Sequence, residues 1–141
     1  AFAEAGLKFS TCGGLVTYLN LLELEMTPFL AQMKQAGQGY VAIRPFCGGL
    51  ITSENLTLAV ENNTEKNQKL SEIMTALEMK TPNVTKFALQ FPLLHPVVAS
   101  VMVSVTTNEH AAQIVAIADG LVSNQETFNQ IINSIFINSS K

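Results

Sequence analysis

The stretch Tyr-Val-Ala-Ile-Arg-Pro-Phe-Cys-Gly-Gly-Leu-Ile-Thr, residues 40–52, decides the fold of this chain. Its first four residues form a short apolar run rich in β-forming types, which is typical of a strand buried on both faces. Pro45 cannot donate a ladder hydrogen bond, and Gly48-Gly49 frees the backbone for positive φ or close approach to a ligand. The stretch therefore predicts a parallel strand followed by a loop in which Arg44 and bare amides could hold an anion. On these residues alone, a tight turn beside a solvated cation is the simpler interpretation.

Strand and helix patterns alternate on both sides of this stretch. Thr27 followed by Pro28 predicts a helix start, with Thr as N-cap and Pro at the first helical position. Two further starts carry the capping-box pattern, at Thr106 to Glu109 and at Ser123 to Glu126. The patterns predict strands at 7–11, 15–22, 40–43 and 97–105, and helices beginning near 27, 64, 81, 107 and 124. Strands that alternate with helices across short joints predict a parallel sheet.

Four pieces of sequence occur in an order and spacing that point to a known family. They are Leu19–Glu23, Ile43–Leu50, Phe87–Phe91 running to His95-Pro96, and Val101–His110. Together they resemble the C-terminal half of the aldo-keto reductase family, and the resemblance covers nearly the whole chain.

The resemblance implies a TIM (β/α)8 barrel, yet a complete barrel needs about 250 residues and this chain has 141. The predicted fold class is therefore α/β, a parallel-stranded half barrel. It has about four strands alternating with helices plus a C-terminal helix. We expect one domain, residues 1–141.

The resemblance also implies a site for NAD or NADP in the loops after the last two strands, where barrel enzymes often hold phosphate groups. The residues implied to contact the cofactor are Arg44, Pro45, Phe46, Gly48, Gly49, Ser104, Thr106 and Gln113.

The family's cofactor motif, Lys-Ser-x-Thr-x-x-Arg-x-x-Glu-Asn, is matched at Ser104 and Thr106. Val103 stands in the place of its Lys, and Glu109 stands in the place of its Arg. Ala112 and Gln113 replace its Glu and Asn. Because both cations that would hold a 2′-phosphate are missing, NAD is expected rather than NADP, or a degenerate site that binds no cofactor.

No catalytic residue is predicted. By resemblance, the family uses an Asp, a Tyr, a Lys and a His, borne on the early part of the barrel, to transfer hydride between nicotinamide and a carbonyl or sugar hydroxyl. The one Asp here, Asp119, precedes Gly120 in a predicted turn, and His95 and His110 lie at helix ends. Tyr18 and Tyr40 lie within predicted strands. The few His and Cys residues are too dispersed for a zinc site, so no metal is expected.

Composition limits the classes of partner. The net charge is -3 and the eight Lys and Arg residues form no basic stripe, so nucleic acid is not expected. No apolar run approaches the roughly 18 residues that span a bilayer, and no signal peptide is evident, so we expect a cytoplasmic protein and no membrane contact. A half barrel leaves strand edges open, which predicts a homo-oligomer or pairing with a missing N-terminal half. The predicted function is an aldo-keto reductase-like oxidoreductase fragment that carries the dinucleotide-binding loops without the catalytic set. The alternative is a non-catalytic half-barrel module that self-associates.

Overall fold

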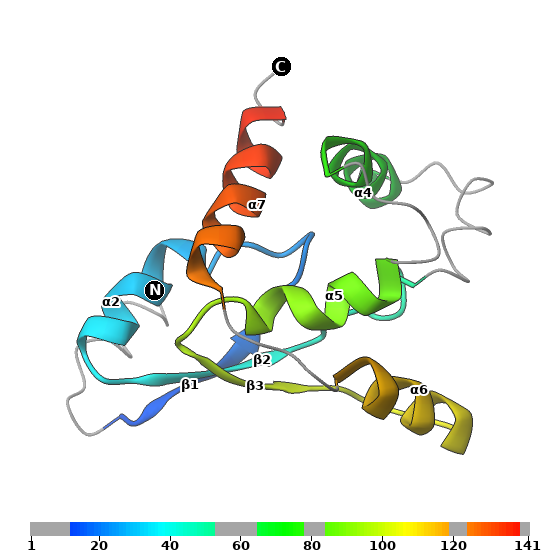
Figure 1. The fold of residues 1–141 in the computed structure, drawn as a ribbon, viewed down its shortest axis with the longest axis horizontal. Helices are drawn as coiled ribbons and strands as arrows, with labels where there is room; N and C mark the ends of the chain where they lie inside the picture. The colour runs from blue at the N-terminus through cyan, green and yellow to red at the C-terminus, as the bar shows by residue number, and fades with distance from the viewer. Residues whose placement is uncertain (1–11, 53–64, 78–83, 119–123, 139–141) are drawn as a thin grey trace.

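Three parallel strands and five helices alternate in the computed structural model, which describes residues 12–52, 65–77, 84–118 and 124–138 (Figure 1). This confirms the predicted α/β class and the parallel sheet. The elements are β1 (Gly14–Tyr18), α2 (Thr27–Gln35), β2 (Gly39–Ile43), α4 (Glu65–Ala76), α5 (Val84–Leu93), β3 (Val98–Met102), α6 (Asn108–Ala118) and α7 (Gln125–Asn138).

The sheet has the order β1-β2-β3, with β2 in the centre. Val16 pairs with Val41 in one direction, and Ile43 pairs with Met102 in the other. Gly14 is required where β1 meets β2, because a Cβ at this position would clash with the carbonyl oxygen of Gly39. Sequence neighbours are thus sheet neighbours, as expected for successive βα units.

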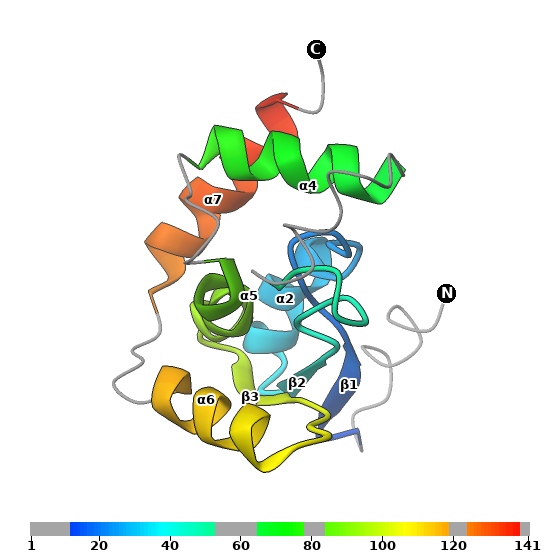
Figure 2. The same ribbon diagram turned by 90° about the vertical axis from the view of Figure 1, so that its right-hand side faces the viewer.

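Helices cover one face of the sheet. Helix α2 packs against β2 and α5 packs against β3, and both lie above the strands in Figure 1. Tyr40 and Ala42 of β2 point to this side and are fully buried. Helices α4 and α7 pack on each other further out, as Figure 2 shows. The core therefore lies between the sheet and these helices, which is where a barrel has its outer layer.

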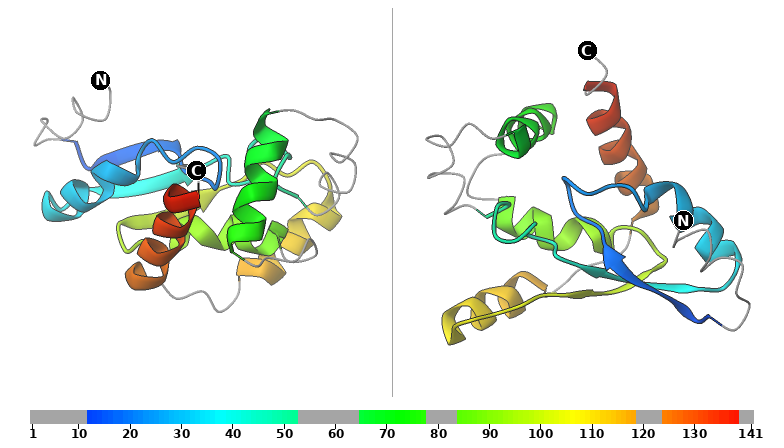
Figure 3. Two further views of the ribbon diagram at one scale, coloured as in Figure 1. Left: turned by 90° about the horizontal axis from the view of Figure 1, so that it is seen from above. Right: turned by 180° about the vertical axis from the view of Figure 1, so that it is seen from behind.

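The opposite face of the sheet is left open by the described residues. Val16 is 61% exposed, Tyr18 44% and Met102 59%, and the residue before each of them is less exposed. Helix α6 lies beyond the end of β3 against α5 (Figure 3). It buries no residue, and its Val115 is 71% exposed. No described helix is long and apolar enough to cross a membrane.

Two strands are shorter than predicted, because the central strand β2, with which both of them pair, ends at Ile43. The strand predicted at 15–22 ends at Tyr18, and the strand predicted at 97–105 ends at Met102. Both final residues lie opposite or beside Ile43, the last residue of β2. At Arg44 the backbone turns to φ 57°, so the neighbouring strands lose their pairing partner at the same level. The strand predicted at 7–11 lies outside the described residues.

Helix starts differ by one residue from the predicted caps. The residue before α2 is Met26, and the hydroxyl of Thr27 donates to the Leu24 carbonyl instead of capping. Helix α6 is capped by Thr107 rather than Thr106, because the His110 amide donates to the Thr107 hydroxyl at 3.1 Å. Helix α7 is capped by Asn124, whose Oδ1 accepts from the Thr127 amide. Thr and Asn are both good capping residues. The sequence pattern therefore located the starts of α6 and α7 to within one residue but did not identify the residue that caps each helix.

His95 gives the fold a predicted pH dependence. Its ring is buried edge-on against Phe128 at 5.1 Å, and Nδ1 accepts from the Val97 amide. Burial, with a smaller effect of the Lys34 charge, lowers the pKa of His95 below its ordinary 6.5. The unfolded chain therefore takes up the proton first as pH falls through 6.5, so stability is full above that pH and is lost below it. The urea concentration at the midpoint of unfolding should fall as the pH is lowered from 7.5 to 5.5. In the His95→Gln variant this fall should be smaller. Equal slopes for the two proteins would contradict this role of His95.

Candidate functional site

A cavity of about 940 Å³ lies at the carboxyl ends of β2 and β3. Its walls come from the loop after β2, the segment after β3, the start of α5 and the inner side of α6. Seven of the eight predicted cofactor residues line it: Arg44, Pro45, Phe46, Gly48, Gly49, Ser104 and Gln113. The eighth, Thr106, is exposed and lies outside the lining, with its hydroxyl 3.5 Å from Nδ1 of His110, which does line the cavity. Residues from two loops and a helix thus meet around one space.

The loop after β2 has an unusual backbone. Arg44 and Cys47 adopt φ of 57° and 49°, and Gly48 and Gly49 adopt 71° and 93°. Left-handed conformations are uncommon for residues other than glycine, and they cluster at ligand sites. The expectation of bare glycine amides is wrong for Gly49, whose N–H donates to the Phe46 carbonyl at 3.0 Å. The Gly48 amide has no such bond within the described residues, so one amide of the pair remains available to a ligand.

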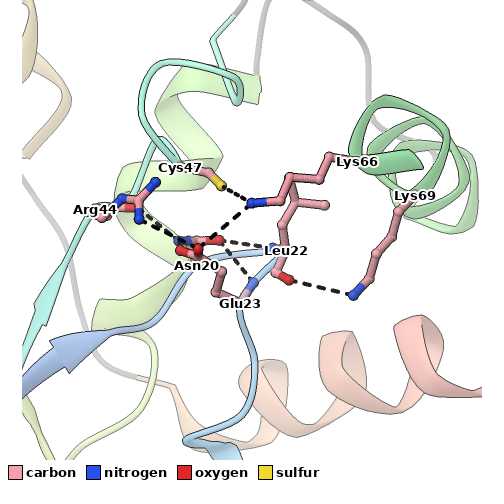
Figure 4. A network of polar contacts seen from close by, with 7 residues as sticks. All are labelled: Asn20, Leu22, Glu23, Arg44, Cys47, Lys66 and Lys69. Atoms are coloured by element: carbon pink, nitrogen blue, oxygen red, sulfur yellow. Dashed lines mark hydrogen bonds and ion pairs between the residues drawn. The ribbon is translucent and has the colours of Figure 1, made fainter. Parts of the chain in front are cut away.

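A buried asparagine holds this loop in place, as Figure 4 shows. Oδ1 of Asn20 accepts from the amides of Leu22 and Glu23, both at 3.0 Å. Its Nδ2 donates to the Arg44 carbonyl at 2.8 Å and to the Glu23 carboxylate at 2.6 Å. The Asn20 side chain is fully buried, so each of these bonds satisfies a group that water does not reach. One carboxamide therefore fixes the ends of β1 and β2 relative to each other.

Arg44 is positioned by two neighbours, Tyr18 and Glu23, at the edge of the cavity. Its guanidinium lies 5.0 Å from the centre of the Tyr18 ring and 3.8 Å from the Glu23 carboxylate. A side-chain hydrogen bond to Tyr18, followed by the charge of Glu23, raises the pKa of Arg44. The side chain is 43% exposed, so solvent screens the ion pair and its contribution is mainly to orientation. Arg44 is thus held in place and still accessible from solvent.

Cys47 is a buried residue of the same loop, and its thiol is expected to have low reactivity. Its Sγ lies 3.9 Å from Nζ of Lys66, on α4. Burial, reinforced by the charge of Glu23, raises the pKa of the Cys47 thiol, although Lys66 and Arg44 act in the opposite direction. A buried thiol with a raised pKa is a poor nucleophile. The structure therefore agrees with a reduced structural cysteine at this position.

Two basic residues of the cavity were missed from the sequence. Lys86 reaches the cavity from the first turn of α5, and His110 reaches it from the first turn of α6. Among the described residues no Asp or Glu lines the cavity, so its charged groups, Arg44 and Lys86, are all cations. Glu109, which stands in the place of the motif's Arg, is outside the lining, whereas Val103, in the place of its Lys, is within it. Lys86 lies outside the motif and His110 stands at one of its variable positions, so the motif singled out neither residue, and the packing of α5 and α6 brings them to the cavity.

The side chains considered for catalysis do not assemble around this cavity. The Tyr40 hydroxyl is tied to the Tyr18 carbonyl at 2.8 Å, and burial raises its pKa well above 10. His95 is packed in the core, and Asp119 lies outside the described residues. Within the described ranges no group of three or more His, Cys, Asp and Glu could hold a metal ion.

Comparison with known proteins identifies a similar fold. No protein-family model matches the chain, and no curated protein sequence matches it. Among solved structures, aldo-keto reductase AKR11C1 from Bacillus halodurans, in its holo form, is similar with a TM-score of 0.72 at 17% sequence identity. The fold is that of a partial aldo-keto reductase barrel. The similar region covers 94% of this chain and 46% of the other, so the chain spans about half the length of that barrel protein. This confirms the predicted fold class and the resemblance on which it was based.

Replacing Asn20 tests whether the partial barrel depends on that carboxamide. Asn20→Ala should remove the side-chain partners of the buried Leu22 amide and of the Arg44 carbonyl, at a cost of about 1 to 3 kcal/mol for each unpaired group, whereas the Glu23 amide keeps its bond to the Asn20 backbone carbonyl. The free energy of unfolding from urea titration should fall accordingly. Asn129→Ala removes an exposed asparagine on α7 and should change it by less than about 0.5 kcal/mol. Similar values for the two variants would show that the Asn20 bonds contribute nothing.

Proposed function

We propose that this chain is the dinucleotide-binding part of an aldo-keto reductase-like oxidoreductase and that its cavity holds NAD. The observation that carries the proposal is the meeting of seven predicted cofactor residues around one cavity, in which the charged side chains of the described lining are both cationic. A volume of about 940 Å³ lies at the upper end of the range usual for ligand pockets, which suits an extended cofactor. The similar solved protein is a holo form of an aldo-keto reductase.

Each wall of the cavity has a role in this proposal. Arg44 and Lys86 supply charge for the diphosphate, since anions bind where cations and free amides converge. Ser104 and the Gln113 amide supply neutral donors at the other wall. The apolar side chains of Phe46, Ile114 and Ile117 provide surface for a base. The residues present therefore fit a dinucleotide, which would supply the hydride chemistry once bound.

The proposed role is binding and orientation, with catalytic groups supplied from outside this chain. In the intact enzyme the substrate would be a small carbonyl compound or a sugar. The Tyr40 hydroxyl is tied to the Tyr18 carbonyl and the His95 ring to the Val97 amide, so among the described groups considered for catalysis only His110 lines the cavity, and one imidazole does not make a catalytic set. This chain would therefore bind the cofactor without turning it over.

Calorimetric titration with NADH tests the cavity. NADH should bind, and Lys86→Gln should weaken binding about 10-fold, because one charge-assisted hydrogen bond is worth roughly 1.4 kcal/mol or more. Lys34→Gln is the matched control, since Lys34 lies on α2 outside the cavity lining. It should leave the affinity within 2-fold. The absence of NADH binding to a folded protein would refute the proposed function, and equal effects of the two substitutions would place the cofactor elsewhere.

Selectivity between NADH and NADPH gives a separate test. NADH should bind more tightly, because Val103 offers no charge to a 2′-phosphate. Val103→Lys should strengthen NADPH binding by roughly 1 to 3 kcal/mol through a charge-assisted bond and should leave NADH nearly unchanged. Glu109→Arg, at a position outside the lining, should have the smaller effect of the two. Tighter NADPH than NADH binding in the unaltered chain would contradict the assignment of Val103.

A further inference from the structure

His110 is the one group of the described cavity lining that can change its charge near neutral pH. The ionisable residues of that lining are Arg44, Lys86 and His110. Arginine and lysine stay charged throughout the neutral range, whereas histidine gains or loses its charge between pH 5 and 8. The cavity therefore combines one charge that depends on a proton with two that are constant.

The hydrogen bonds of His110 leave part of its ring available to a ligand. Its backbone amide donates to the Thr107 hydroxyl at 3.1 Å, as part of the helix cap. Its Nδ1 lies 3.5 Å from the Thr106 hydroxyl, at the outer limit of a hydrogen bond. Within the described ranges Nε2 has no hydrogen-bond partner, and the residue is exposed. One ring nitrogen is therefore oriented by Thr106, and the other can contact a ligand.

The charges around His110 favour an anion in this cavity. Arg44 reaches the cavity from the loop after β2 and Lys86 from α5, while the segment 103–107 contributes no ionisable side chain. Glu109, beside His110 on α6, lies outside the lining. A dinucleotide carries negative charge on both phosphates of its diphosphate, and an anion close by favours the charged form of an imidazole. Binding of the diphosphate and protonation of His110 should therefore strengthen each other.

We propose that His110 takes up a proton when the cavity binds the dinucleotide and donates from Nε2 to its diphosphate, so that cofactor affinity rises as the pH falls. The role of His110 rests on the proposed function and adds to it a residue that the family motif does not single out. Thr106 is a positioning residue, because a charged imidazole donates from both nitrogens and the Thr106 hydroxyl accepts from Nδ1. The motif threonine thus acts on the cavity through His110 without lining the cavity itself.

Calorimetric titration with NADH at pH 8.0 and 6.5, in two buffers of different ionisation enthalpy, measures affinity and proton uptake together. The unaltered chain should bind NADH about 5-fold more tightly at pH 6.5, with uptake of a fraction of a proton, because a charge-assisted hydrogen bond is gained. His110→Gln keeps a polar side chain that cannot take up the proton. In this variant both the pH dependence and the proton uptake should disappear.

His95→Gln is the matched control, since His95 is the other of the two histidines and is buried outside the cavity lining. It should keep both the pH dependence and the proton uptake. Thr106→Val removes the hydroxyl and keeps the β-branched shape, so it should reduce the proton uptake without abolishing it. Thermal unfolding of each variant at both pH values checks that the protein titrated is folded.

The outcomes separate the role of His110 from the proposed function. NADH binding that is equally tight at the two pH values, with no proton uptake, would overturn the role of His110 and leave the proposed function standing. Uptake retained in His110→Gln, or lost in His95→Gln, would overturn it as well. Unchanged uptake in Thr106→Val would contradict the positioning role of Thr106. A folded chain that binds no NADH at either pH would refute the proposed function, and the role of His110 with it.

Discussion

The carboxamide of Asn20 is the constraint on which the site depends. It joins the turn after β1 to the carbonyl of Arg44, the residue at which β2 ends. A buried amide with all of its hydrogen-bonding capacity used can adopt very few alternative arrangements, because any other leaves polar groups unpaired away from water. The ends of two neighbouring strands are therefore held at one level. The loop that forms the cavity wall begins from that fixed point.

Arg44 transmits this constraint to the cavity. Its backbone is held by Asn20 in a left-handed conformation, which turns the chain away from the sheet and ends the pairing of β1 and β3 with β2. Its side chain is oriented by Tyr18 and Glu23 toward the same edge. The cost of positive φ at a residue other than glycine is of the order of 1 to 3 kcal/mol, and the buried hydrogen bonds of Asn20 offset it. Strand length, loop shape and cation placement thus have one common origin.

The two faces of the sheet differ in how far they are covered: helices bury one face, and the described residues leave the other exposed. On the helical side, Tyr40, Phe91 and Leu30 are fully buried and form the centre of a continuous core. On the other side, the strands expose Val16 and Met102. A sheet that is buried on both faces has strands that are apolar at successive positions, without regular alternation of polar residues. The strands of this chain have that mostly apolar pattern. The pattern of residues was suited to two covered faces, of which the described chain covers one.

The sequence by itself determined the class of fold, because its signals are local. The apolar run before Arg44-Pro45, the spacing of Leu70 and Ile73 on α4, and the capping residues before α6 and α7 specify a strand, a helical face and helix starts from neighbouring residues alone. The loop residues of the cavity followed from the same local pattern by resemblance to a family. What only the tertiary structure decided involves residues far apart in the chain. Lys86 faces the cavity because α5 packs on β3, and Asn20 meets Arg44 because β1 and β2 pair in one register. Such contacts depend on how elements pack together, which no single stretch of sequence encodes.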